Sequence, residues 1–237
     1  MIIWFSIFAI IIFVSFILAF SSMRNFREIP EKQIEYSLFL IGNPKALTDE
    51  TMDFLYKETS KSGLILSIEK LFKGKKEAVV IFGPKYILEK LTKSLELLEL
   101  EDYVKVDENS ITAWEMGVGS PREAGKRKET NNLFTSIPEL LELEQIWWQV
   151  SLLAENKKSS FRAQIRVVVI SPDEKRREAL GQIVQNIGGE YIIKLPQAYS
   201  SLQILSLFNQ RSVQHKHKFP LTLDIKEVRH FIPPHQS

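Results

Sequence analysis

The chain has 237 residues, of which 44% are hydrophobic and 25% are charged, and this length accommodates one large or two small domains. Its 31 basic and 29 acidic residues leave a formal net charge of +2, so charge alone does not point to bulk nucleic-acid binding. No cysteine is present, which excludes a disulfide framework, a thiolate zinc site and a cysteine nucleophile.

The N-terminal stretch predicts a transmembrane helix over residues 1–23. Residues 2–20 carry no charge and match the ~20 apolar residues that a helix needs to cross a bilayer. A cleaved signal peptide is the alternative, but no Lys or Arg precedes the apolar run, which is also longer than the apolar part of a usual signal peptide. Because Arg24 and Arg27 follow directly, the positive-inside rule predicts a single-pass protein of the inner (cytoplasmic) membrane with its C-terminal part in the cytoplasm.

Residues 30–108 alternate strand and helix patterns in the order βαββαβ. The first helix begins after Thr48, whose hydroxyl is a favourable N-cap, and ends at Gly63. The apolar runs on either side of Lys73 to Lys76 predict a hairpin. We expect strands over 33–42, 64–72, 77–83 and 102–106, and helices over 48–63 and 84–99. This order is that of a ferredoxin-like module.

Residues 110–196 repeat that element order. The patterns predict strands over 110–118, 144–155, 161–171 and 190–195, and a short helix over 133–143. A second helix starts with Ser171 as N-cap and Glu174 to complete a capping box. Residues 197–237 form a helical and extended C-terminal segment. The sequence therefore predicts an α+β fold, with an N-terminal transmembrane helix followed by two tandem ferredoxin-like (βαββαβ) modules.

One face of the strands over 144–155 and 161–171 is a candidate interaction surface. Both strands alternate, and one side carries an aromatic, two amide and two basic side chains: Trp147, Gln149, Arg162, Gln164 and Arg166. Arginines beside a tryptophan can hold and stack nucleic acid, anchor a protein contact, or pack against another module. We favour the protein contact because only one aromatic residue flanks the arginines and the chain is close to neutral.

No motif of a known catalytic site is present. The chain lacks the Gly-Lys-Ser/Thr ending of a phosphate-binding loop, a Gly-x-Ser-x-Gly elbow and a His-Glu-x-x-His pair. We therefore expect no catalytic residues, no cofactor and a protein that is not an enzyme. The histidines near the C-terminus do not have the spacing of a fixed ligand set, so no metal site is predicted: His215, His217, His230 and His235. The basic loop over 119–132 has no assigned role.

Three stretches resemble the amino-terminal membrane-anchor and accessory region of conjugative-transfer and type IV secretion ATPases, including their coupling-protein-like forms. They are the N-terminal apolar helix, residues 144–188, and residues 219–237. In the last stretch, four residues resemble the segment that leads into the family's motor domain, with spacing that differs by a residue: Leu223, Glu227, His230 and Pro233. The family continues into a motor domain, whereas this chain stops at Ser237. The resemblance implies the N-terminal part of an ATPase, a split gene product or a stand-alone accessory subunit.

The expected function is a membrane-anchored, non-catalytic assembly module of a conjugative-transfer or type IV secretion machine. It would dock a motor ATPase or its own copies at the cytoplasmic membrane. The alternative is a membrane-tethered nucleic-acid-binding module that uses the 144–170 sheet face. The expected partners are thus the membrane and a protein, with nucleic acid as the alternative partner.

Overall fold

The structure is a computed structural model that describes residues 34–118, 139–155, 159–187, 192–196, 199–214 and 221–232. From Glu35 onward, the described residues form one compact unit built on a nine-stranded sheet. Its strands are β1 (Tyr36–Ile41), β2 (Ile65–Lys73), β3 (Lys76–Pro84), β4 (Leu97–Leu100), β5 (Ile111–Val118), β6 (Gln145–Glu155), β7 (Ser160–Ile170), β8 (Ile192–Lys194) and β9 (Leu221–Asp224). They run in the order β4-β1-β3-β2-β6-β7-β5-β8, β9 also pairs with β7, and every pairing is antiparallel.

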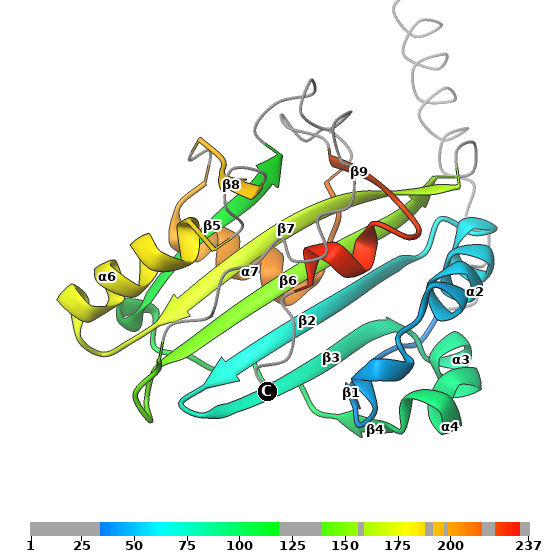
Figure 1. Cartoon of the computed structure of the whole chain (residues 1–237), viewed down its shortest axis with the longest axis horizontal. Coiled ribbons are helices and arrows are strands. Elements are labelled where there is room, and N and C mark those ends of the chain that lie inside the picture. The colour runs from blue at the N-terminus through cyan, green and yellow to red at the C-terminus, as the bar shows by residue number, and fades with distance from the viewer. Residues whose placement is uncertain are drawn as a thin grey trace, which may run out of the picture. The chain divides into compact units, whose positions relative to one another are not determined.

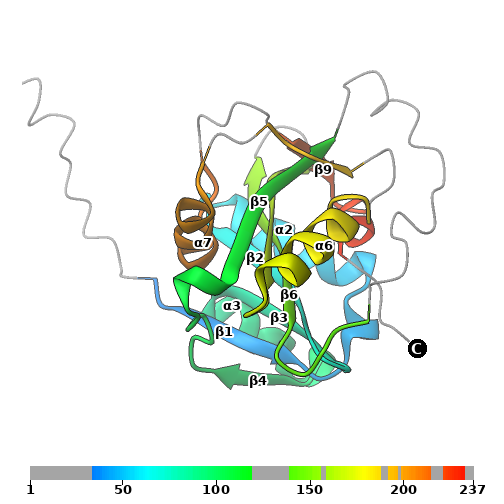
Figure 2. The same cartoon turned by 90° about the vertical axis from the view of Figure 1, so that its left-hand side faces the viewer.

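Helices lie on both faces of this sheet. The α-helices are α2 (Asp49–Ser60), α3 (Lys85–Leu88), α4 (Thr92–Leu95), α6 (Glu174–Gln185) and α7 (Ser201–Gln210), and the 3-10 helices are η1 (Pro44–Ala46), η2 (Glu89–Leu91), η3 (Glu108–Ser110) and η4 (Val228–Phe231). Figure 1 shows α2, α6 and η4 in front of the strands. Figure 2 shows α7 on the opposite side, where it packs on β5 and β7.

Two apolar cores follow from the alternation of the long central strands. On the side of α2, α6 and η4, β6 contributes Ile146, Trp148, Val150 and Leu152, and β7 contributes Phe161, Ala163, Ile165 and Val167. On the α7 side a smaller core gathers around Trp147 and Phe208. The predicted alternation is thereby confirmed, but both faces of β6 and β7 are buried, as the central strands of a covered sheet require.

The prediction of two tandem ferredoxin-like modules is wrong, because the strands of both halves form one sheet. β2 and β6 pair along their length, from Ile65 opposite Leu153 to Lys73 opposite Gln145. Two separate modules would leave each of these long strands with an unpaired edge, which is open to unwanted association. The two halves do follow the same relative order from edge to centre, β4-β1-β3-β2 and β8-β5-β7-β6, as parts of a single sheet.

The predicted helix over 84–99 is broken, and the strand that follows it lies earlier than predicted. The chain forms α3, η2 and α4 and then turns at Glu96, whose φ is 51°. The backbone carbonyl of Glu96 accepts a hydrogen bond from Gly42 N at 3.2 Å, which places the next residues beside β1. Leu97–Leu100 thus pairs with β1 as β4, while the predicted strand over 102–106 forms no regular structure.

Helix ends explain further differences. Thr48 caps α2 as predicted, with its hydroxyl accepting from Thr51 N. In α6, however, the helix begins at Glu174 and the cap is Asp173, whose carboxylate accepts from Arg176 N at 2.8 Å. Ser171 lies two residues earlier, where it is buried and its backbone N–H donates to the carbonyl of Ser110. In the predicted helix over 133–143, only 139–143 are described, and these form a turn and not a helix.

The predicted transmembrane helix, residues 1–23, lies outside the residues that the structure describes. Within the described ranges, no helix is both long and apolar enough to cross a bilayer. This finding conflicts with the prediction of a single-pass protein of the inner membrane with a cytoplasmic C-terminal part, and that prediction is corrected here.

Candidate functional site

The five predicted surface residues do lie together on one side of β6 and β7. Gln149 is directly opposite Arg166, and the neighbouring pairs along the two strands bring Trp147, Gln164 and Arg162 onto the same side. Four of the five are buried, and only Arg162 reaches solvent, with 29% of its side chain exposed. This face is therefore covered and does not form an open surface.

Helix α7 is the cover. Ser200 caps it through a capping box with Gln203, and its apolar stripe contains Ile204, Leu205 and Phe208. This stripe packs on the apolar end of the sheet face, and the ring of Phe208 lies 5.8 Å from that of Trp147. An amphipathic helix next to a half-apolar sheet face buries both. The stripe is visible in the sequence, but nothing there assigns it to this face.

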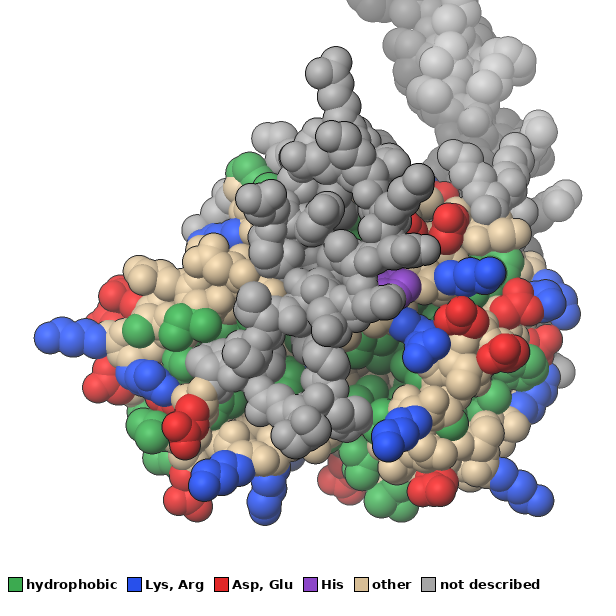
Figure 3. Space-filling view, viewed as in Figure 1, with side chains coloured by type: hydrophobic (Ala, Val, Ile, Leu, Met, Phe, Trp, Pro, Cys, Tyr) green, Lys and Arg blue, Asp and Glu red, His purple; other side chains and the backbone are tan. Residues whose placement is uncertain are grey.

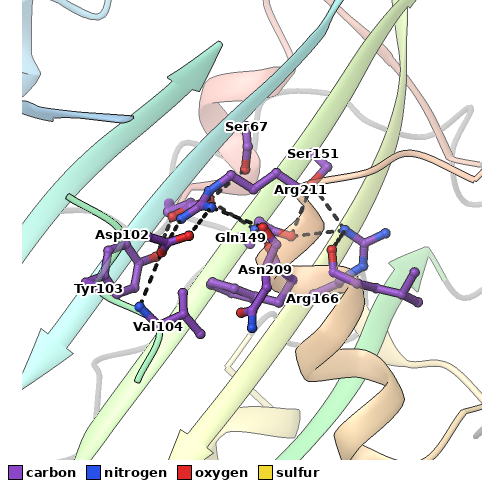
Figure 4. Close-up of polar contacts among 12 residues, drawn as sticks. Ser67, Asp102, Tyr103, Val104, Gln149, Ser151, Arg166, Asn209 and Arg211 are labelled. Atoms are coloured by element: carbon purple, nitrogen blue, oxygen red, sulfur yellow. Dashed lines mark hydrogen bonds and ion pairs between the residues drawn. The ribbon is translucent and has the colours of Figure 1, made fainter. Parts of the chain in front are cut away.

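Beneath the cover, buried polar side chains from β2, β6 and β7 meet the end of α7 (Figure 4). We call Glu69, Gln149, Ser151, Gln164, Arg166 and Arg211 the buried polar network, and each of them is less than 5% exposed. Arg166 is one centre of it. Its guanidinium donates to Gln149 Oε1 (3.0 Å), Ser151 Oγ (3.2 Å), Leu207 O (3.2 Å), Gln164 Oε1 (2.6 Å) and Ser212 O (2.7 Å). It thus ties both strands to the end of α7.

Arg166 keeps its charge although it is fully buried. Burial lowers the pKa of Arg166 to about 10, and the attraction of Glu115 opposes that shift. The two groups form an ion pair, with 3.7 Å between Arg166 Nε and Glu115 Oε1. Since a pKa of about 10 lies well above neutral pH, the side chain is a cation there and needs the acceptors around it.

Glu69 is the second centre, and it accepts hydrogen bonds from several directions. Its Oε1 accepts from Arg211 Nε (2.9 Å), Gln149 Nε2 (3.0 Å) and Ser67 Oγ (3.1 Å), and its Oε2 accepts from the hydroxyl of Tyr103. Burial and the charge of Glu69 raise the pKa of Tyr103 well above its ordinary value, so that hydroxyl stays a donor. A buried carboxylate is tolerated when it has this many donors.

Arg211 connects Glu69 to the solvent-facing edge of the network. Its Nη1 and Nη2 donate to the two carboxylate oxygens of Asp102 at 3.1 and 3.2 Å. Burial acts to raise the pKa of Asp102, but the hydrogen bonds and charge of Arg211 outweigh it and lower that pKa. Arg211 also ends α7 with a φ of 50° and lies 4.9 Å above the ring of Phe82. The end of α7 is therefore fastened to the sheet by the ion pair with Glu69 and the contact with the ring of Phe82, and to the segment after β4 by the ion pair with Asp102.

Gln149 joins the two centres. Its amide nitrogen donates to Glu69 and, at 2.8 Å, to the carbonyl of Phe208, while its amide oxygen accepts from Arg166. A side chain that uses both its donor and its acceptor internally has little capacity left for a ligand. The arrangement can fasten α7 onto the sheet, and the same bonds make these groups inaccessible to nucleic-acid bases or phosphates in this conformation.

Sequence reasoning found half of this network. It selected Gln149, Gln164 and Arg166 but missed Glu69, Ser151 and Arg211. The signal for Glu69 was a charged Glu-Lys pair inside the otherwise apolar run of β2. Arg211 carried no local signal, because its partners lie 142 and 109 positions away in the chain.

Arg162 stands apart from the network. It donates to Glu155 Oε1 at 2.8 Å from Nη2, across the same β6–β7 pair. Figure 3 shows the opposite face, on the side of α2, α6 and η4, where basic and acidic side chains are interspersed and no broad basic patch is visible among the described residues. Neither the pairing of Arg162 nor that face has the character of a phosphate-binding surface.

The other half of the α7-side face has no described helix over it. One row of side chains crosses the whole sheet on this side: Leu98, Leu40, Val80, Glu69, Gln149, Arg166 and Glu115. The buried polar network occupies one end of this row, and apolar residues occupy the other. We call these apolar residues, which are half-buried or exposed, the open quadrant: Tyr36, Leu40, Phe82, Leu98 and Leu100.

The open quadrant has a hydrophobic surface with a fixed shape. The rings of Tyr36 and Phe82 stack with centroids 5.3 Å apart, and Arg211 covers Phe82 from the network side. Leu98 on the edge strand β4 is 61% exposed. A group of apolar side chains partly open to water beside a sheet edge has the chemistry of a protein contact.

Comparisons with known proteins identify no family model and no curated protein that matches the chain. The resemblance to transfer ATPases therefore stays a prediction. Within the described residues, no group of three or more His, Cys, Asp or Glu side chains is arranged to hold a metal ion. His215, His217, His235 and the basic loop over 119–132 lie outside the described residues.

Proposed function

We propose that the chain is a non-catalytic assembly module that binds another protein through the open quadrant. The observation that carries this proposal is the exposed apolar end of the cross-sheet row, where Leu98 lies on an edge strand beyond the reach of α7. Exposed contiguous apolar surface beside a polar rim is typical of protein interfaces. The partner is the one expected from the sequence: a motor ATPase or a second copy of the chain.

Nucleic-acid binding on the β6–β7 face has less support. Stacking needs an exposed aromatic ring, and Trp147 is 3% exposed beneath α7. Phosphate binding needs accessible cations. The buried guanidinium of Arg166 already donates hydrogen bonds to side chains and carbonyls of its own chain. The geometry favours a protein partner and a different surface from the one that the sequence suggested.

Site-specific photo-crosslinking in the native cells tests this proposal. Leu98 is replaced by p-benzoylphenylalanine, and Leu202, an exposed leucine on α7, receives the same replacement as the matched control. We expect position 98, but not position 202, to give a discrete covalent adduct, because only position 98 lies in the open quadrant. Mass spectrometry of the adduct distinguishes a motor ATPase from a second copy of the chain.

Two results would count against the function. One is the absence of an adduct from position 98 in cells that contain the folded protein. The other is the same set of adducts, in the same yields, from positions 98 and 202, since that pattern indicates random collisions.

A further inference from the structure

The outer edge of β4 has no partner strand among the described residues, although its inner edge pairs with β1. Natural edge strands are usually protected by an inward or flanking charge. In β4 the charged side chain is Glu99, and it lies on the helix side of the sheet, where it accepts from Ser37 Oγ at 2.8 Å and Lys85 Nζ at 2.9 Å. On the open-quadrant side of this edge, the residues of β4 are Leu98 and Leu100, and neither is charged.

The charge around this edge is strongly acidic. Residues 96–102 contain four acidic residues and no basic residue. Asp102 is bound by Arg211 and Glu99 by Lys85, but Glu96 and Glu101 are exposed at the two ends of β4. An incoming strand therefore meets apolar side chains on one face and carboxylates on the other.

We propose that the edge of β4 binds an extended segment of a partner protein in which apolar and basic residues alternate, so that the segment adds a strand to the sheet. This inference rests on the proposed function and specifies how the partner protein binds. Residues of the added strand that lie opposite Leu98 and Leu100 are apolar and extend the open quadrant. Residues opposite Glu99 and Glu101 are basic, because directly opposed charges of opposite sign stabilise a strand pair.

The same charges disfavour a second copy as the occupant of this edge. Pairing β4 with β4 of another copy would bring together two acidic segments, and directly opposed like charges destabilise a strand pair. Basic residues on the added strand avoid this repulsion. The occupant is therefore a different protein with a basic extended segment.

A fluorescent probe peptide tests the inference on the full chain. The probe has about eight residues, the length of an ordinary strand, with valine and lysine in alternation. Two control peptides accompany it: one has glutamate in place of lysine, and the other is N-methylated at every residue so that neither edge of its backbone has a hydrogen to donate. We expect saturable binding of the lysine probe by fluorescence anisotropy, and no saturable binding of either control.

Two substitutions locate the binding site. Glu101→Lys should weaken probe binding about fivefold, since it replaces an attraction by a repulsion at the surface. Leu98→Lys should weaken it at least as much, whereas Leu202→Lys on α7 should not change it. Hydrogen exchange followed by NMR should show new protection of the outward amide groups among residues 97–100 only with the lysine probe.

Each alternative outcome is decisive. Equal binding of the N-methylated and unmodified peptides would overturn strand addition. Unchanged binding of the lysine probe to the Glu101→Lys variant would overturn the inference that the added strand has basic residues opposite the carboxylates. Dimerisation of the purified chain that Leu98→Lys abolishes would assign the edge to a second copy instead. An adduct from position 98 together with failure of the lysine probe would leave the docking function intact and remove only this mode of binding.

Discussion

Arg166→Met is expected to lower the free energy of unfolding by about 3–5 kcal/mol, the usual effect of removing one member of a buried ion pair. The substitution keeps the length of the side chain but removes the donors that satisfy Gln149, Ser151, Gln164 and two carbonyls at the end of α7. It also leaves the carboxylate of Glu115 buried beside an apolar side chain. Urea unfolding followed by circular dichroism measures the effect.

Arg162→Met is the matched control, because both arginines lie on β7 and face the same side of the sheet. Arg162 is partly exposed and its ion pair with Glu155 is screened by water, so the expected loss is below about 1 kcal/mol. The alternating pattern of β7 does not distinguish the two arginines. Equal losses for the two variants would contradict the structural role given to Arg166.

Glu69→Gln is expected to lower the free energy of unfolding by about 3 kcal/mol, because it leaves the buried Arg211 without its nearest charge partner. Asp102→Asn makes the same carboxylate-to-amide change on the other side of Arg211, where the Asp102 side chain is 57% exposed. Solvent screening should keep its effect below about 1 kcal/mol. Urea unfolding of both variants measures the two effects under the same conditions.

The comparison of Glu69→Gln with Asp102→Asn separates burial from pairing. If ion pairing to Arg211 alone decided stability, the two carboxylates would matter equally. A larger loss for Asp102→Asn than for Glu69→Gln would place the important contact at the solvent edge and contradict the buried network as the fastening of α7.

Local patterns predicted the elements that local chemistry determines. Thr48 begins α2 because its hydroxyl accepts from the backbone N–H of Thr51, three residues along the chain. The hairpin between β2 and β3 turns at Gly74, whose φ of 54° suits glycine. The alternation of β6 and β7 correctly assigned each side chain to a face.

Features that depend on distant partners could not be predicted in the same way. The pairing of β2 with β6 joins segments separated by the whole of β3 to β5, and an apolar strand does not specify which edge it will meet. Trp147 and Arg166 look like an exposed binding pair in the sequence because α7, which covers them, begins more than thirty residues later. Leu98 differs from its prediction in the opposite direction. It was predicted within a helix, but the turn at Glu96 places it, exposed, on the edge strand β4.

The central claim is that the polar face is closed by α7 and the open quadrant is accessible, and the labelling rate of single cysteines tests it most directly. The chain has no cysteine, so Ser151→Cys beneath α7 and Leu98→Cys on β4 each give one reporter thiol. We predict that a thiol reagent labels Leu98→Cys freely and Ser151→Cys about a thousandfold more slowly, because the buried site must open first. Rates within about tenfold of each other in folded protein would mean that α7 opens readily, which contradicts the account.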